Sequence, residues 1–335
     1  MALNSQQRGR VFERFIKQIL LNSGFNVVSI DEPIIYQSGS GLMLQGLAQP
    51  HNTDVLMDPP FQIPFFFPSR LIVECKCYKK AIGLPVIRNV LGLREDVNSF
   101  DIVTKEVLEK RKDYRRPGPA VFDRERYFYQ VAVASLSGFT KPAQEFALVH
   151  RIPLINIKRM PFCQRLIDAL FSGATDEGND TLEDGATNMD PLIEEQWQAL
   201  QGSFRDILNS FCIAILSSGD ILFLYTEIGG QWYFDAEEIE LHWSENKRLW
   251  QIKPYQRNGN AQSWFELPDI MFEKWTEKEF DRMEAIEMKE KHFKYIYVIG
   301  KNTSGTAQLK VLKLSRQFIR EARERIQHRN EQYDG

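Results

Sequence analysis

Two carboxylates and one ammonium group lie at the ends of two short apolar segments. Asp54 opens a run that ends at Met57, while Glu74 and Lys76 end the run that begins at Leu71. Side chains alternate along a strand, so Glu74 and Lys76 should share one face. Burying like charges is costly unless a cation neutralises them, and hard oxygen ligands suit Mg²⁺ or Mn²⁺. The three residues therefore indicate metal-assisted hydrolysis of a phosphodiester.

The size and composition of the chain indicate a globular protein with two domains. It has 335 residues, of which 43% are hydrophobic, and six of them are tryptophan. The N-terminus lacks the layout of a signal peptide, and no apolar run approaches the ~20 residues needed to cross a membrane. We therefore expect a cytoplasmic protein with no membrane partner. Four cysteines are too few and too clustered for a disulfide scaffold, so we expect reduced thiols.

Charge is unevenly distributed along the chain and marks the domain boundaries. Residues 1–172 contain 23 Lys and Arg against 16 Asp and Glu, although the whole chain has a net charge of −3. Residues 173–195 contain eight acidic residues and no basic ones. Their small, polar composition cannot bury enough apolar surface to become ordered. We therefore predict a basic first domain at 1–172, an acidic flexible linker at 173–192 and a second domain at 193–335.

Hydrophobic periodicity in the first domain predicts a mixed sheet. Apolar residues recur at helical spacing from Val11 to Leu20, and Ser23 and Gly24 end that helix. The remaining predicted elements are a strand at 25–30, the two acidic strands, a helix at 84–97, a strand at 129–135, a helix at 141–150 and a strand at 152–157. This order predicts an α/β domain whose mixed sheet is flanked by helices on both faces.

Two insertions interrupt the first domain, and a different pattern follows the linker. Residues 58–68 are rich in Phe and Pro and predict an extended hairpin or arm, because proline excludes a helix and a central strand. Residues 98–128 form the second insertion. The second domain is predicted to be a smaller α+β domain with a short helix at 193–201, a hairpin at 212–225, a helix near 277–291, strands at 295–299 and 308–312, and a basic helix at 315–328.

Four ordered segments of the first domain resemble a known family. They are a helix that carries Glu13, a glycine-containing segment at 46–56 that leads to Asp54, the strand Val73-Glu74-Cys75-Lys76, and a closing β-α-β unit at 133–157. Together these segments resemble the PD-(D/E)xK nuclease superfamily, and within it the Mrr-like restriction endonuclease group. The resemblance covers about residues 8–158 and implies a restriction-endonuclease-like fold.

The resemblance implies a role for each residue of the motif. Asp54 and Glu74 would bind a divalent ion, with the Cys75 carbonyl oxygen as a further ligand. Lys76 would orient or deprotonate the attacking water and offset charge on the phosphorus. Glu13 would complete the metal shell or orient a water ligand. A surface ion pair between Glu13 and Lys17 is the structural alternative.

Other polar residues are candidates for binding nucleic acid. His51 could hydrogen-bond a phosphate or the aspartate, although a loop histidine is more often incidental. A basic run could grip phosphates, or it could be a solvated face. This run contains Lys110, Arg111, Lys112, Arg115 and Arg116.

These observations lead to one expected function and two alternatives. We expect a Mg²⁺- or Mn²⁺-dependent endonuclease that hydrolyses DNA in restriction or defence against foreign genetic material. The alternatives are a non-catalytic nucleic-acid-binding module with a nuclease-like fold, and an effector gated by a ligand of the C-terminal domain. RNA as the substrate, a homodimer, and a protein or small-molecule regulator stay open.

Overall fold

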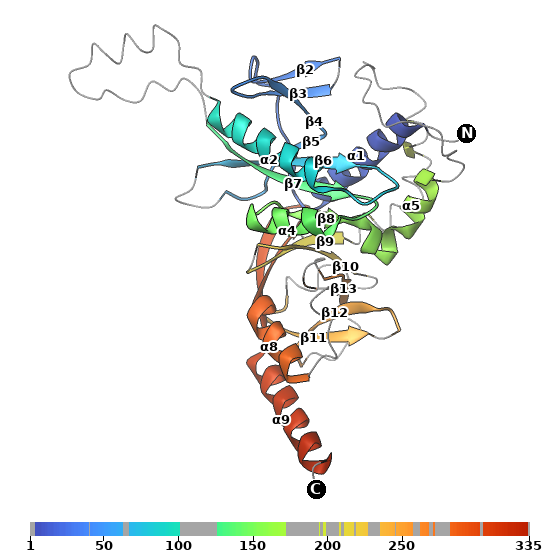
Figure 1. Ribbon diagram of the computed structural model, residues 1–335. Coiled ribbons are helices and arrows are strands. Elements are labelled where there is room, and N and C mark those ends of the chain that lie inside the picture. Colours follow the sequence, from blue (N-terminus) through green and yellow to red (C-terminus); the bar gives the residue numbers. More distant parts are fainter. Residues whose placement is uncertain are drawn as a thin grey trace, which may run out of the picture.

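The structure is a computed structural model, shown in Figure 1. It describes residues 4–39, 41–62, 67–100, 126–171, 211–217, 219–226, 235–244, 246–256, 262–267, 282–301 and 304–333, together with positions 194, 197, 198, 208 and 271. No helix in these ranges is both long enough and apolar enough to cross a membrane.

A mixed five-stranded sheet forms the centre of the N-terminal part. Its strand order is β1-β5-β6-β7-β8, with antiparallel pairing on the β1 side of β6 and parallel pairing on the β8 side. The strands are β1 Asn26–Val27, β5 Val55–Asp58, β6 Ser69–Lys76, β7 Phe128–Ser135 and β8 Leu154–Asn156. The predicted α/β class and the mixed sheet are confirmed, although β1 is shorter than the predicted strand.

Helices cover both faces of this sheet, as the sequence predicts. Helix α1 Ser5–Asn22 begins with a capping box in which Asn4 and Gln7 bond each other's backbone, and it packs on one face. Helices α2 Leu84–Ser99 and α4 Lys141–Val149 pack on the other face. Both begin with a proline in the first turn, where its missing N–H costs nothing. After β8 the chain forms two short 3₁₀ turns, η1 Ile157–Arg159 and η2 Pro161–Cys163, and then α5 Gln164–Phe171.

A three-stranded antiparallel sheet precedes β5 and was not predicted. It consists of β2 Ile35–Ser38, β3 Gly41–Gln45 and β4 Pro50–Thr53. Gly41 has a φ of 126°, and a side chain there would approach the Asn52 amide. Leu44 and Ile35 are fully buried against the α2 face of the main sheet, so this small sheet extends the core toward Asp54.

The C-terminal part is a closed seven-stranded barrel in the order β10-β13-β12-β11-β15-β14-β9. Every neighbouring pair is antiparallel except β11 and β15. The strands are β9 Phe211–Leu216, β10 Ile221–Tyr225, β11 Glu238–Ser244, β12 Leu249–Pro254, β13 Ser263–Phe265, β14 Tyr295–Lys301 and β15 Ala307–Leu314. The predicted hairpin and the two later strands are confirmed, but closure of the strands into a barrel was not predicted.

Two described helices accompany the barrel. Helix α8 Arg282–Phe293 begins within the predicted range 277–291 and ends two residues beyond it, while positions 277–281 lie outside the described residues. Helix α9 Arg316–Tyr333 extends away from the barrel toward the C-terminus in Figure 1. The buried cluster of the barrel is mainly aliphatic and includes the neighbouring aromatic rings of Trp250, Phe265 and Phe293.

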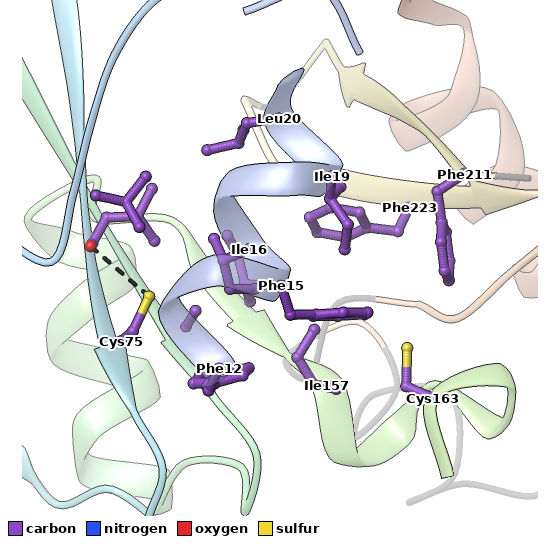
Figure 2. Packing of buried hydrophobic residues seen from close by; sticks show 14 of the residues in the cluster. Phe12, Phe15, Ile16, Ile19, Leu20, Cys75, Ile157, Cys163, Phe211 and Phe223 are labelled. Atoms are coloured by element: carbon purple, nitrogen blue, oxygen red, sulfur yellow. Dashed lines mark hydrogen bonds between the residues drawn. The ribbon is translucent and has the colours of Figure 1, made fainter. Parts of the chain in front are cut away.

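Helix α1 also connects the sheet to the barrel. In Figure 2 Phe15 and Ile19 extend from α1 toward Phe211 and Phe223 of the barrel, and all four belong to one buried cluster. The Asn22 Nδ2 atom donates a hydrogen bond to the carbonyl of Leu208 at 2.9 Å. The two parts of the chain therefore share a hydrophobic core, whereas the whole of the predicted flexible linker at 173–192 lies outside the described residues.

Candidate active site

The side chains of β6 alternate between the two faces of the sheet. Val73 and Cys75 belong to the buried cluster that contains α1, whereas Ile72 belongs to the cluster that contains α2 and α4. Glu74 and Lys76 therefore share the face of Ile72, as the sequence predicts. Both side chains are partly buried near the carboxyl end of the strand.

Asp54 is held beside this strand by a backbone hydrogen bond. It lies between β4 and β5, and the antiparallel register Val55 to Val73 places it opposite Glu74. The Cys75 N–H donates to Asp54 Oδ2 at 2.7 Å. This bond and the strand register hold the Asp54 carboxylate in place.

Lys76 forms an ion pair with Glu74 at the same place. The Lys76 Nζ and Glu74 Oε1 atoms are 2.5 Å apart, and the two side chains are only 18% and 19% exposed. Burial alone would lower the pKa of Lys76, but the negative charges of Glu74 and Asp54 raise this pKa well above its usual range. Lys76 therefore carries its positive charge throughout the neutral pH range.

Glu13 reaches the same site from α1. Burial, followed by the negative charge of Asp54, raises the pKa of Glu13 to about 8. Arg10 and Lys76 act in the opposite direction. Since Asp54 is the strongest electrostatic influence on Glu13, the structure places this carboxylate with the motif residues.

Asp54 is also a perturbed acid. Burial, followed by the charge of Glu74, raises the pKa of Asp54 to about 6, although Lys76 and the Cys75 N–H stabilise its charged form. The site thus contains three carboxylates and one lysine, and this lysine is ion-paired with Glu74. Such an excess of buried negative charge favours uptake of either protons or a cation.

The donor set fits a hydrated divalent ion better than a site enclosed by side chains. Among the described residues, no group of three or more His, Cys, Asp or Glu side chains is arranged to hold a metal ion. Mg²⁺ in phosphoryl-transfer sites usually uses one or two carboxylates and retains several waters. Asp54 and Glu74 meet this requirement, and the negative charge around them is what a divalent cation would offset.

The backbone of Cys75 can contribute an oxygen to such an ion, whereas its thiol cannot. The Lys76 carbonyl oxygen accepts a hydrogen bond from the N–H of Leu136, which follows β7. Because the backbone groups of successive residues point to opposite edges of a strand, the N–H and the carbonyl of Cys75 point to the edge of β6 away from β7. That edge is the side of Asp54, to which the Cys75 N–H donates. The Cys75 sulfur is buried in the cluster under α1, and burial raises the pKa of this thiol.

Arg10 was not singled out by the sequence and lies close enough to influence Glu13. It precedes Glu13 by three positions, so the two side chains emerge from the same side of α1. Its charge favours the ionised form of Glu13. The spacing of three residues between Arg10 and Glu13 was the feature of the sequence that could have identified Arg10 as a neighbour of Glu13.

The other sequence-predicted residues are not brought into this group. His51 Nε2 lies 2.7 Å from Asp96 Oδ2, and this hydrogen bond holds the pKa of Asp96 below its usual range. His51 thereby ties β4 to α2. The predicted phosphate-binding residues Lys110, Arg111, Lys112, Arg115 and Arg116 all lie outside the described residues.

Comparisons with family models, curated proteins and solved structures found no match to this chain.

Proposed function

We propose that the chain is a Mg²⁺- or Mn²⁺-dependent endonuclease that hydrolyses phosphodiester bonds in DNA, with a PD-(D/E)xK nuclease domain at about residues 8–158. The observation that carries this proposal is the convergence of Asp54, Glu74 and Lys76 at one edge of β6, with Glu13 beside them. An acidic pair next to a permanently charged lysine is suited to binding a metal ion and a phosphate group together.

The proposed roles follow from the environment of each side chain. Asp54, Glu74 and the Cys75 carbonyl would hold the ion, which supplies a bound water of lowered pKa and stabilises negative charge on the phosphate. Lys76 would remain an ammonium group and stabilise the charge that develops on the phosphate oxygens, because its raised pKa opposes service as a base.

Glu13 is suited to a different role from the other two carboxylates. With a pKa of about 8 it changes protonation state close to neutral pH, where a proton acceptor is most effective. We propose that Glu13 holds a water molecule at the site and exchanges a proton with it.

The charge of the first domain supports a polyanionic substrate. Residues 1–172 have 23 basic against 16 acidic residues, which suits a polyanionic partner. Action on foreign DNA in restriction or defence is the biological role that we propose. The residues that would grip the phosphate backbone include the basic run at 110–116.

A plasmid cleavage assay with the purified full-length protein tests this proposal. Supercoiled plasmid should be cut with Mg²⁺ or Mn²⁺ and remain intact with EDTA. Asp54→Asn and Lys76→Met should abolish cutting and retain the circular dichroism spectrum of the wild type. The matched controls Glu287→Gln and Lys313→Met change exposed residues of α8 and β15 and should cut normally.

The outcomes separate the proposal from its competitors. Cutting by both Asp54→Asn and Lys76→Met would place the active site elsewhere. DNA binding without cutting under any divalent metal would identify a non-catalytic binding module. Cleavage of single-stranded RNA but not of DNA would correct the substrate.

A further inference from the structure

The hairpin of β14 and β15 belongs to the most one-sidedly charged stretch of the barrel. Residues 291–320 include the whole hairpin and contain seven Lys and Arg but neither Asp nor Glu. Protein surfaces usually intersperse both signs, and a field of a single sign attracts partners of the opposite charge. The hairpin is therefore a candidate surface for an anionic partner.

Alternation along the two strands gives the hairpin an inner and an outer face. Ile296, Val298 and Leu312 belong to the buried cluster of the barrel, so the other set of alternating positions points outward. No outward position of the hairpin is acidic. The outward positions include Tyr295, Tyr297 and Lys301 on β14 and Leu309, Val311 and Lys313 on β15.

Cross-strand pairing arranges the outer face as a stripe with a lysine at each end. Tyr295 lies opposite Lys313 and Tyr297 opposite Val311, while Lys301 ends β14. Val311 is 37% exposed, and both tyrosines are partly exposed. Six residues separate Tyr295 from Lys301, which is about 20 Å along the strand. The stripe thus offers aromatic and apolar surface between two positive charges.

Further basic residues lie where β14 begins and β15 ends. The Leu314 N–H donates to the Lys294 carbonyl at 3.2 Å, which places Lys294 beside the end of β15. Lys294 and Arg316 are both exposed. The parallel pairing of β11 with β15 sets the acidic residue Glu238 beside Lys313, so it offsets part of the charge of that lysine. Lys294 and Arg316 add two further positive charges at this end of the stripe.

The sheet part of the chain bounds the opposite end of the stripe. A Cβ atom at Gly24, which follows α1, would lie 2.8 Å from the Cβ atom of Ala307 at the start of β15. Ile299 of β14 belongs to the buried cluster that contains α1. The exposed part of the stripe therefore runs from the start of α9 toward the sheet part and ends there.

We propose that the outer face of β14 and β15 binds single-stranded nucleic acid. Tyr295 and Tyr297 are about 7 Å apart along the strand, so each ring is available to a separate base. Lys313 and Lys301 suit the phosphates of a strand that lies along the hairpin. This binding needs neither the metal nor Asp54, so it goes beyond the proposed nuclease activity and does not depend on it.

The same features disfavour other anionic partners. A duplex keeps its bases stacked on one another, so it gains nothing from the tyrosine rings. An acidic peptide brings carboxylates but not a flat ring for each tyrosine. A flat bilayer does not fit a stripe that ends against the sheet part of the chain.

Fluorescence anisotropy with the full-length protein tests the proposal. The probe is a fluorescein-labelled oligothymidylate of about 20 nucleotides, in EDTA and about 50 mM NaCl. The wild type should bind it with a Kd of about 10 μM or tighter. Reversal of two exposed charges in Lys294→Glu/Lys313→Glu should weaken binding at least about tenfold and leave the Tm unchanged.

A charge reversal elsewhere on the barrel provides the matched control. Lys247 is exposed in the turn between β11 and β12, and β11 carries the chain about 20 Å away from Lys313 before this turn. Lys247→Glu should bind the oligothymidylate as the wild type does. Equal weakening by Lys247→Glu would show that net charge alone governs binding, and this would overturn the proposal.

A second variant tests the stacking. Tyr295→Leu/Tyr297→Leu keeps apolar side chains on the hairpin but removes both rings, and it should weaken binding at least about tenfold. The proposal is also overturned if this variant or Lys294→Glu/Lys313→Glu binds normally, or if a duplex or poly-glutamate competes as well as unlabelled oligothymidylate. The assay measures binding without metal, so its failure leaves the plasmid cleavage test unaffected.

Discussion

Replacing Glu13 by glutamine should stabilise the metal-free protein at alkaline pH. The folded protein raises the pKa of Glu13 from 4.5 to about 8, mainly through burial and then through Asp54. Above pH 5 the unfolded chain releases this proton while the folded chain retains it. The stability linked to Glu13 is therefore fully present below pH 4.5 and is lost as the pH rises toward 8.

The size of this effect follows from the pKa difference. Each pKa unit corresponds to about 1.4 kcal/mol, so a rise from 4.5 to about 8 gives an upper limit of about 5 kcal/mol. Glu13 is partly exposed, and its ionisation is coupled to that of Asp54, so we expect about 2–3 kcal/mol. Glutamine keeps the shape of the side chain and has no charge at any pH. The free energy of unfolding of Glu13→Gln should thus exceed that of the wild type by this amount at pH 8 and equal it near pH 5.

Urea unfolding in EDTA at pH 5, 6, 7 and 8, followed by circular dichroism, measures the difference directly. Glu287→Gln removes an exposed carboxylate from α8 and should follow the wild type at every pH. A constant difference between Glu13→Gln and the wild type across the four pH values would refute the reasoning. So would a wild type whose stability does not fall between pH 5 and pH 8.

Three further predictions concern packing, His51 and the thiols. Phe15→Ala removes a fully buried ring from the cluster shared by α1 and the barrel, and it should cost about 3–5 kcal/mol in the free energy of urea unfolding. His51→Ala breaks the contact with Asp96, so it should cost about 1–3 kcal/mol and leave the plasmid cleavage rate near the wild-type value. Ellman's reagent at pH 8 should leave the buried thiols of Cys75 and Cys163 unmodified until the protein is denatured, because burial raises both pKa values.

The sequence was sufficient for the elements of the N-terminal sheet because their local signals agree. The apolar period of α1, the proline in the first turn of α2 and the short apolar run 131–134 of β7 agree with the signals at the ends of these elements. The small sheet β2–β4 was missed because Gly41 to Gln45 reads equally well as a loop. Its burial depends on long-range contacts with α2 and with the main sheet, which no local pattern reports.

Closure of the barrel could not be derived from its strands. The hairpin of β9 and β10 has a local turn signal at Gly219, and β14 and β15 are close in sequence. The pair β14 with β9 and the parallel pair β11 with β15 join segments far apart in the chain. Strand patterns predict that an exposed strand edge must be paired or covered, but they do not identify the strand that pairs with it.

The site shows the same division between local and long-range information. Alternation along β6 placed Glu74 and Lys76 on one face, and this is confirmed by the cluster membership of their neighbours. The hydrogen bond from Cys75 N–H to Asp54 depends on the register of β5 against β6, which the sequence does not reveal. The pKa of Glu13 depends on burial by tertiary packing, so only the structure shows that this carboxylate retains a proton near neutral pH.

The position of Glu13 makes the carboxylate site dependent on the barrel. Helix α1 carries Glu13 toward Asp54 and, two residues later, packs Phe15 against Phe211 of the barrel. Coulomb interactions between buried charges vary with their separation, so a shift of α1 changes the interaction between Glu13 and Asp54. Packing in the barrel thus influences how many protons the site holds at neutral pH. Because protons and a divalent cation would compete for the same carboxylates, helix α1 connects barrel packing to the metal binding that we propose.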